Sequence, residues 1–193
     1  MDVINKIPER YKTIALDDWK DWESISTIKE YQKDEVFINE GEMSKFCGFV
    51  LSGAFKNVTY TDNFDERIIN FGFETDFLAS CESYNNQCPS AFSIVAIEPS
   101  KVLVVENDAL VTLCYKNQNV ANFGFLLTQL LMQQHEEHLK ILSLTNPIAR
   151  YQYIMKNHPD LIQKVTLTDL AKYLYISREA LSRARKQAFL FSK

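Results

Sequence analysis

The segment from Val165 to Lys186 constrains the fold of this chain more than any other stretch of its sequence. Apolar residues recur at helical spacing from Leu167 to Leu174, and a polar, basic run follows Ser177. Ser177 is a typical N-cap residue, because its hydroxyl accepts a hydrogen bond from a backbone N–H in the first turn of a helix. The pattern predicts two short helices joined by a tight turn, with the second helix beginning after Ser177.

A helix-turn-helix of this kind places its second helix in the major groove of DNA, and the polar residues here suit that task. Arginine donates two parallel hydrogen bonds to guanine, and glutamate accepts one from the cytosine amine. The residues expected to contact DNA are Thr168, Ser177, Arg178, Glu179, Ser182, Arg183, Arg185 and Lys186. Candidate phosphate contacts outside this set are Arg150, Lys156, Lys164 and Lys172, although an ordinary surface charge is the favoured alternative for any single one of them. The alternative, two solvated amphipathic helices without a ligand, is less favoured because cap, apolar spacing and polar face agree.

Charge is divided unevenly along the chain. Residues 1–145 contain 12 Lys/Arg and 22 Asp/Glu, a net charge of −10, whereas residues 146–193 contain 9 Lys/Arg and 3 Asp/Glu, a net charge of +6. The negatively charged phosphates of a nucleic acid attract only the basic residues 146–193. The division therefore predicts an acidic sensor joined to a basic module that meets nucleic acid.

The residues before this module predict helices around a set of short strands. We expect helices over residues 9–30, 108–115, about 118–144 and 148–157, the last one following Asn146-Pro147. Between them, β-rich runs bounded by turn residues predict six strands: Val36–Ile38, Phe46–Leu51, Phe55–Tyr60, Arg67–Phe73, Phe92–Ile97 and Val102–Val105. Their spacing indicates a small antiparallel sandwich or barrel, whose interior has room for a small ligand.

The long helix carries more apolar residues than one helix buries against a small barrel. This excess is typical of a dimer-forming helix. The residues expected at the interface are Phe123, Leu127, Leu130, Leu131 and Leu142. The alternative for these residues is packing within their own chain.

Composition narrows the class of protein further. No apolar run reaches the ~18 residues of a membrane helix, and the N-terminus lacks the apolar core of a signal peptide, so a cytoplasmic protein is expected. The cysteines at 47, 81, 88 and 114 lack zinc-ligand spacing and are expected to be reduced, with a redox role for Cys81 and Cys88 left open. We find no phosphate-binding glycine loop or nucleophile elbow, and we expect no catalytic residue, metal or cofactor.

Several segments of the chain, in order, resemble the Crp/Fnr family of bacterial transcription regulators. Ile176–Arg183 is similar to the family's recognition-helix pattern Ser-Arg-Glu-x-x-x-Arg. Asp34–Glu42 and Phe49–Gly53 resemble its early β-roll strands, and Ser90–Ala96 resembles the strand after its phosphate-binding cassette. The form of the recognition helix is similar to that of a Bacteroidetes-type branch, whose effectors are mostly unknown.

The resemblance implies an α+β fold in three parts. These are a cyclic-nucleotide-binding-like, cupin-like β-roll sensor domain over residues 1–116, a dimerisation helix over 117–145 and a helix-turn-helix DNA-binding domain over 146–193. It implies a homodimeric, sequence-specific regulator that binds double-stranded DNA, with RNA polymerase and an unknown small effector as further candidate partners. The alternative is a small-ligand-binding signalling module whose degenerate helix-turn-helix contacts protein instead of DNA.

The chain departs from the family pattern in features that bear on its effector. Cyclic-nucleotide-binding members carry a Gly-Glu pair and an Arg in the cassette, where this chain has Ala79-Ser80 and Ser90. A cyclic phosphate would lose its countercharge and meet Glu82 nearby, so we expect no cyclic AMP binding. Residues 1–46 contain no cysteine, which argues against an iron–sulfur cluster.

The helix-turn-helix also departs from the family pattern. Tyr175 stands where the turn usually has glycine, at a cost of about 1 kcal/mol if it adopts a positive φ. The chain ends soon after Lys186, so we expect the wing hairpin of many relatives to be reduced or absent.

The effector, if there is one, is expected to lie between the cassette and the long helix. Candidate lining residues are Ser80, Cys81, Glu82, Ser83, Tyr84, Ser90, Ala91, His135 and Glu136. The two carboxylates and the missing arginine favour a neutral or cationic small molecule. The alternative is a filled roll that binds no ligand and only supports the dimer.

Overall fold

The computed structural model describes residues 16–190, which form two compact units. The first unit contains the residues up to Thr59 and those from Phe71 to Met132. The second unit contains Tyr60–Asn70 and the residues from Gln133 onward. A β-hairpin and a long helix therefore pass from the first unit into the second.

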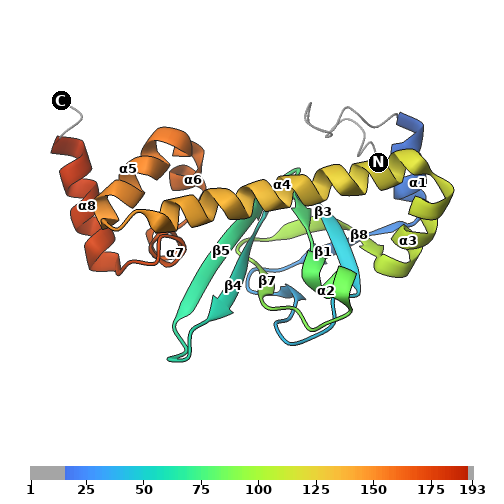
Figure 1. Cartoon of the computed structure of the whole chain (residues 1–193), viewed down its shortest axis with the longest axis horizontal. Helices are drawn as coiled ribbons and strands as arrows, with labels where there is room; N and C mark the ends of the chain where they lie inside the picture. The colour runs from blue at the N-terminus through green and yellow to red at the C-terminus, as the bar shows by residue number, and fades with distance from the viewer. Residues whose placement is uncertain (1–15, 191–193) are drawn as a thin grey trace. The chain divides into compact units, whose positions relative to one another are not determined.

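The first unit is built around two four-stranded sheets (Figure 1). One sheet has the order β1-β8-β3-β6 and the other the order β2-β7-β4-β5. Their strands are β1 Ser26–Tyr31, β2 Val36–Ile38, β3 Phe46–Ser52, β4 Ala54–Tyr60, β5 Glu66–Phe73, β6 Phe77–Leu78, β7 Ser93–Ala96 and β8 Ser100–Glu106. The antiparallel pairing of β1 with β8, β3 with β8 and β4 with β7 confirms the predicted small antiparallel β structure.

Helices α1 Leu16–Ser24, α2 Cys81–Asn86, α3 Asn107–Lys116 and α4 Gln118–Ser143 complete this part of the chain. The prediction of one helix over residues 9–30 is wrong beyond Ser24, because Ser26–Tyr31 pairs with Ser100–Val105 as an edge strand. Pairing with β8 supplies the backbone hydrogen bonds that a helix would otherwise make, and tertiary context of this kind overrides local preference. Residues 9–15 lie outside the described residues.

Two apolar cores lie on opposite sides of the sheet that contains β3 and β8. On the helix side, Trp19, Trp22, Phe77 and Phe123 meet edge to face, with ring centroids 5.3 to 6.0 Å apart. Figure 1 shows α1 and α3 beside the first turns of α4 on this side. Edge-to-face packing of this kind adds about 0.5–1.5 kcal/mol per pair beyond the burial of apolar area.

The second core fills the interior of the β-roll. Phe55, Ile94 and Val102 are fully buried there. Tyr31 and Phe37 pack against Phe55 with ring centroids 5.8 and 6.3 Å from its own. Side chains therefore occupy much of the interior in which the sequence had suggested a ligand.

The second unit contains helices α5 Pro147–Asn157, α6 Pro159–Lys164, α7 Leu167–Tyr173 and α8 Arg178–Leu190. Thr166 Oγ1 accepts from the N–H of Asp169 at 3.1 Å, and Ser177 Oγ accepts from the N–H of Ala180 at 3.1 Å. The Ser177 cap begins α8 at the predicted place, and the Thr166 cap begins α7. Tyr175, in the turn between them, has φ +53°. The predicted pair of short helices joined by a tight turn is thus present, and α6 was not predicted.

Within residues 16–190, no helix combines the length and the hydropathy that a membrane span requires.

Candidate functional site

The outer face of α8 presents polar and basic side chains to solvent. Arg178, Glu179, Ser182, Arg183 and Lys186 are all exposed. Hydrogen bonds from the backbone N–H of Glu179 and from Ser177 lower the pKa of the Glu179 carboxyl, which is therefore ionised at neutral pH. This face therefore offers hydrogen-bond donors from its arginine side chains and a charged hydrogen-bond acceptor from Glu179.

The remaining residues predicted to contact DNA are less available for a hydrogen bond to it. Ser177 is exposed, but its hydroxyl is engaged in capping α8. Thr168 and Arg185 are partly buried. The structure thus brings Arg178, Ser182 and Arg183 together on one open surface and leaves Thr168 and Arg185 at its edges.

The side chain of Arg150 in α5 links the C-terminal ends of α4 and α7. Its guanidinium donates to the carbonyl oxygens of Leu142, Leu144 and Leu174 at 2.9, 2.6 and 2.8 Å. Leu142 lies in the last turn of α4, and Leu144 and Leu174 directly follow α4 and α7, where helical partners for carbonyl groups run out. Arg150 is half-buried and three of its five N–H donors are bonded inside the protein, so the exposed Lys156 and Lys164 suit a phosphate contact better.

Tyr175 is fixed from two sides in its left-handed conformation. The guanidinium of Arg67 lies 4.7 Å from the centroid of the Tyr175 ring, and the ring of His138 meets it edge-on at 5.5 Å. Lys172 forms an ion pair with Glu66 at 3.0 Å, and its contact with phosphate stays a prediction. The segment Tyr60–Asn70 of the β4–β5 hairpin therefore belongs to the support of the turn, which no local sequence signal had shown.

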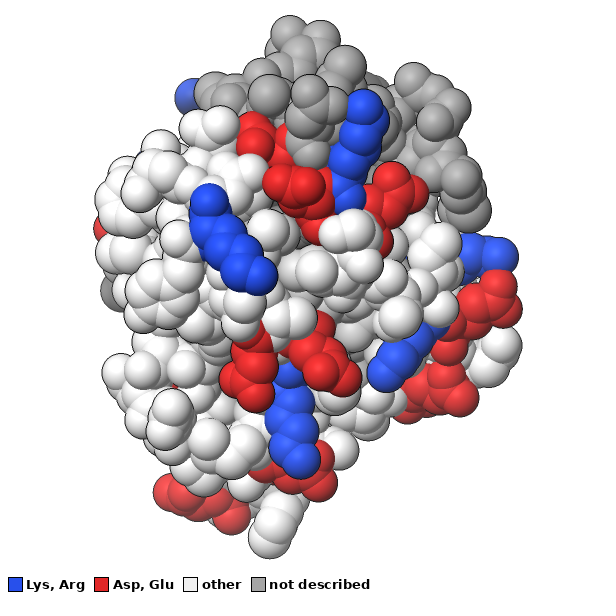
Figure 2. Space-filling view, turned by 90° about the vertical axis from the view of Figure 1, so that its right-hand side faces the viewer, with Lys and Arg blue, Asp and Glu red and all other residues white. Residues whose placement is uncertain are grey.

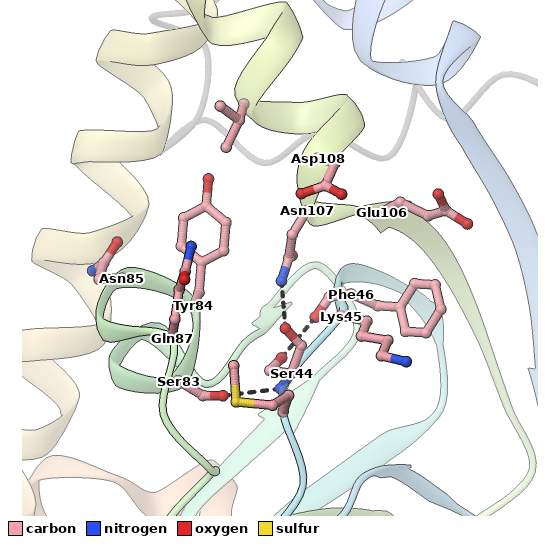
Figure 3. Close-up of a pocket in the computed structure, with 12 residues that line it drawn as sticks. Ser44, Lys45, Phe46, Ser83, Tyr84, Asn85, Gln87, Glu106, Asn107 and Asp108 are labelled. Carbon is pink, nitrogen blue, oxygen red and sulfur yellow. Dashed lines mark hydrogen bonds between the residues drawn. The ribbon is translucent and has the colours of Figure 1, made fainter.

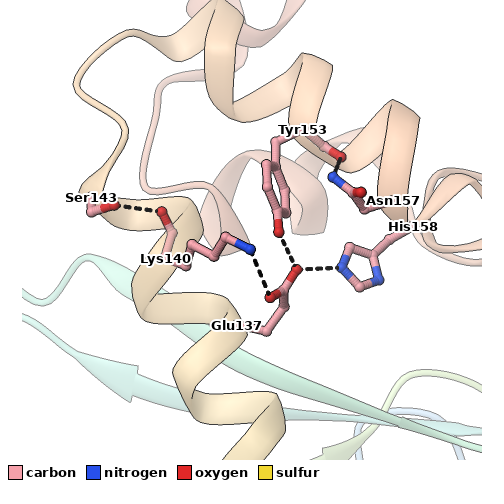
Figure 4. Close-up of polar contacts among 6 residues, drawn as sticks. All are labelled: Glu137, Lys140, Ser143, Tyr153, Asn157 and His158. Carbon is pink, nitrogen blue, oxygen red and sulfur yellow. Dashed lines mark hydrogen bonds and ion pairs between the residues drawn. The ribbon is translucent and has the colours of Figure 1, made fainter.

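A carboxylate cluster joins the last turns of α4 to α5 and to the turn after it (Figure 4). Glu137 Oε1 accepts from the hydroxyl of Tyr153 at 2.6 Å and lies 3.0 Å from Nε2 of His158. Lys140 adds an ion pair with Glu137 at 3.9 Å. The hydrogen bonds from Tyr153 and His158 lower the pKa of the Glu137 carboxyl. This cluster positions the C-terminal helices on α4.

The cassette of the first unit, residues 76–91, contains no Lys or Arg side chain. Ser90 Oγ donates to Ser80 Oγ at 2.9 Å, and both residues are buried. Glu82 and Ala91 are exposed, whereas Ser83 is buried and accepts from the N–H of Ser44 at 2.9 Å. The structure brings Ser80, Cys81, Ser83 and Ser90 together around α2. His135 and Glu136 are exposed on α4, within the second unit.

A groove opens beside α2, at the start of α3 (Figure 3). Its volume is about 790 Å³. Two hydrogen bonds tie its floor together, one from Ser44 to Ser83 and one from Nδ2 of Asn107 to the carbonyl oxygen of Ser44 at 2.7 Å. Lys45, Glu106 and Asp108 give its rim mixed charge. The groove therefore selects neither anions nor cations strongly.

A smaller cavity of about 250 Å³ lies against the same segment and shares Ser44, Phe46, Tyr84, Asn85 and Asn107 with the groove. Cys47, Cys81 and Cys114 line it. Burial raises the pKa of all three thiols, that of Cys47 to about 12. A protonated thiol is a poor nucleophile and a poor metal ligand. Among the described residues, no group of three or more His, Cys, Asp or Glu is arranged to hold a metal ion.

Among the described residues, the face over α1 and α3 in the first unit offers no basic surface comparable to α8. Figure 2 shows Lys and Arg interspersed with Asp and Glu on an otherwise uncharged surface there.

In the first unit, the predicted interface residues Phe123 and Leu127 are buried in the helix-side core. Both were expected to contact a second chain, and that prediction is wrong, because Trp19, Trp22 and Phe77 already cover this face of α4. Leu130, Leu131 and Leu142 are partly buried.

Comparisons with known proteins agree with this fold. Residues 28–117 match the family model of the cyclic nucleotide-binding domain. No curated protein sequence matches the chain.

Solved structures with the same fold cover almost the whole chain. FixK2 from Bradyrhizobium japonicum is 19% identical, with a TM-score of 0.76 over 87% of this chain and 86% of its own. The c-di-GMP-responsive global regulator CLP from Xanthomonas campestris is 13% identical, with a TM-score of 0.74 over 92% of this chain and 93% of its own. The catabolite activator protein of Thermus thermophilus is 17% identical, with a TM-score of 0.60 over 95% of this chain and 87% of its own. At these identities the likeness establishes the fold.

Proposed function

We propose that this chain is a Crp/Fnr-type transcription regulator, a cytoplasmic homodimer that binds double-stranded DNA sequence-specifically through α8. The observation that carries the proposal is the open face of α8, where Arg178, Ser182 and Arg183 are exposed together directly after the Ser177 cap. Arginine side chains on the first turns of such a helix read guanine in the major groove. RNA polymerase is a further candidate partner of a regulator of this kind.

The basic charge of the C-terminal part supports the same proposal. Residues 146–193 carry a net charge of +6, against −10 for the preceding residues. Lys156, Lys164 and Lys186 are exposed, and each suits a phosphate contact. Binding to DNA through this part releases counterions, so it weakens steeply with salt.

The proposed dimer uses a different face of α4 from the one the sequence suggested. Phe125, Met132 and Leu139 are 67%, 58% and 66% exposed. They recur every seven residues, which is the repeat of a coiled-coil seam. We call these three residues the apolar stripe of α4, and a second copy of the same helix covers it in the proposed homodimer.

The proposed effector is not a cyclic nucleotide. Residues 76–91 contain no Lys or Arg, and Ser80 and Ser90 are bonded to each other in the interior. A buried phosphate without an arginine or comparable donor set is costly. Calorimetric titration with cyclic AMP is expected to give no saturable heat, and a saturable 1:1 isotherm would overturn this part of the proposal.

The salt dependence of binding to a mixed-sequence duplex tests the basic surface. The double variant Arg178→Ala/Arg183→Ala is expected to bind at least ~10-fold more weakly than the wild type and to show a shallower slope of log K against log salt. The control, Lys33→Ala/Lys116→Ala, removes the same charge from exposed positions of the first unit and is expected to bind as the wild type does. Equal binding by the two double variants would favour the second candidate function, a signalling module in which α8 contacts protein.

A further inference from the structure

The cavity of about 250 Å³ is walled by the helix-side core of the first unit. Trp22 of α1, Phe77 of β6 and Leu127 of α4 belong both to that core and to the cavity wall. Leu110 and Cys114 of α3 close another side. The fully buried residues of the roll interior, such as Phe55 and Ile94, do not line it. The cavity is therefore a separate space from the interior of the roll.

The described residues that wall this cavity carry no charge. Their apolar and aromatic side chains are joined by hydroxyl, amide and thiol groups, and no Asp, Glu, Lys, Arg or His is among them. The thiols of Cys47, Cys81 and Cys114 are protonated, since burial raises their pKa. An ionic ligand would lose its hydration here without gaining a countercharge.

Most polar groups in the wall already have partners. The Thr128 hydroxyl donates to the carbonyl oxygen of Gly124 at 3.0 Å, and Asn107 donates to that of Ser44. Trp22 is different: it is 2% exposed, and among the described residues its indole N–H has no hydrogen-bond partner. The indole nitrogen is itself enclosed by protein atoms, so the polar groups of the wall offer a ligand few free hydrogen-bonding partners.

The size of the cavity limits what it can hold. A cavity of about 150 Å³ lined by apolar side chains binds benzene. The larger volume here accommodates about two rings or an aliphatic chain of similar bulk. The residues shared with the outer groove, among them Tyr84 and Asn85, mark the side from which a ligand arrives (Figure 3).

We propose that this cavity binds a small, uncharged, largely apolar molecule, which reaches it through the groove beside α2. The proposal deepens the effector site of the proposed function and rests on it for its regulatory meaning, but binding itself requires only the first unit's fold. The cavity wall contains Gly124, Leu127, Thr128 and Leu131 of α4. A ligand bound in the cavity therefore contacts α4, the helix that carries the apolar stripe.

Two fluorescent probes of matched shape test the proposal. 1-Naphthylamine is neutral and apolar at neutral pH, and 1-naphthylamine-8-sulfonate has the same two fused rings with an added sulfonate. We expect the neutral probe to bind the full chain saturably at one site per chain, and the sulfonate to leave it undisplaced. Absence of saturable binding by the neutral probe, or its equal displacement by the sulfonate, would contradict the proposal.

A cavity-filling variant locates the binding. A Cβ placed on Gly124 meets no heavy atom within 4 Å, so Gly124→Leu fills the cavity and removes a helix-disfavouring glycine. We expect this variant to lose at least ~10-fold in probe affinity while its thermal midpoint stays at or above that of the wild type. Asn119→Leu adds the same side chain at an exposed position of α4 and is expected to bind the probe normally. Unchanged probe affinity in a folded Gly124→Leu would overturn the assignment.

The cysteines give a second measurement that is independent of fluorescence. Cys81 and Cys114 line the cavity, whereas Cys88 lies outside its lining and donates to the carbonyl oxygen of Glu82 at 3.7 Å. The neutral probe is expected to slow alkylation of Cys81 and Cys114 by N-ethylmaleimide and to leave Cys88 unaffected. Equal protection of all three thiols would show binding elsewhere. DNA binding is measured separately on the same protein. A chain that binds DNA but not the probe contradicts only this site, whereas a chain that binds the probe but not DNA contradicts only the proposed function.

Discussion

The imidazole of His138 stacks on the ring of Tyr173, with centroids 4.2 Å apart and 12° between the ring planes. Nε2 of His138 lies 2.8 Å from the carbonyl oxygen of Tyr173, so this nitrogen carries the proton and donates. His138 belongs to α4, and Tyr173 ends α7 next to the turn before α8. The long helix therefore contacts the turn that sets the direction of α8 through a titratable group.

Stability of the second unit should depend on the protonation of His138. Burial is the main cause that lowers its pKa from 6.5; charge from His135 and Arg150 adds to this, and the hydrogen bond to Tyr173 opposes it. Below pH 6.5 the unfolded chain binds a proton that the folded chain does not. The free energy of unfolding should therefore fall as the pH drops from 6.5 towards the folded-state pKa, and this contribution should be fully present above 6.5.

The variant His138→Gln isolates this effect, because its amide can donate to Tyr173 but does not titrate. Urea unfolding between about pH 7.5 and about pH 5.5 should show a smaller loss of stability on acidification than in the wild type. His135→Gln, at an exposed position of the same helix, should keep most of the wild-type slope. Parallel pH profiles for the wild type and His138→Gln would refute the role of this histidine.

Arg150 should be the most sensitive cation of the C-terminal helices. Arg150→Ala leaves three carbonyl acceptors without their charged donor, so we expect a loss of about 2–4 kcal/mol in the free energy of unfolding. Lys156→Ala, at an exposed site of the same helix α5, should change it by less than about 0.5 kcal/mol. If denaturant unfolding gave similar small values for both, Arg150 would not support the helix ends as described.

The interaction of Arg67 with Tyr175 can be measured by a double-mutant cycle. Tyr175 has φ +53°, and its replacement by glycine removes backbone strain together with the ring that Arg67 covers. Arg67→Ala should cost about 0.5–1 kcal/mol more in the wild type than in the Tyr175→Gly background. A coupling energy of zero would mean that Arg67 does not stabilise the turn through the Tyr175 ring.

These examples show which parts of the structure the sequence predicts. Thr166, Ser177 and the apolar spacing around Leu170 act within a few residues, and they place α7 and α8 correctly. Alternating β-rich runs likewise locate β2, β3 and β4. Local signals suffice where an element is fixed by its own caps and periodicity.

Long-range packing decides what the sequence does not predict. Ser26–Tyr31 becomes a strand because β8 pairs with it, and Arg150 is structural because carbonyl oxygens at the ends of two other helices converge on it. The cavity depends on which faces of α3 and α4 meet β3, so Cys47 and Cys114, far apart in sequence, could not be assigned to one wall beforehand. Phe123 and Phe125 are two residues apart in one apolar helix, and only the fold shows that one is buried and the other exposed.

The apolar stripe of α4 should control the oligomeric state. Leu139→Glu places a charge in the proposed helix–helix seam and should weaken self-association by at least ~10-fold in sedimentation equilibrium. Tyr115→Glu, at a position of α3 that is 89% exposed, should leave the association constant unchanged. A wild-type chain that sediments as a monomer at all concentrations would contradict the homodimer.

Selection of DNA from a random duplex pool tests the central claim most directly. We expect the purified wild type to enrich a palindrome whose half-sites lie about 10 base pairs apart centre to centre, with guanines that lose their preference in Arg178→Ala and Arg183→Ala. The control Lys33→Ala/Lys116→Ala should enrich the same palindrome. Failure to enrich any motif at low salt, with the cavity either empty or saturated with the neutral probe, would contradict the account.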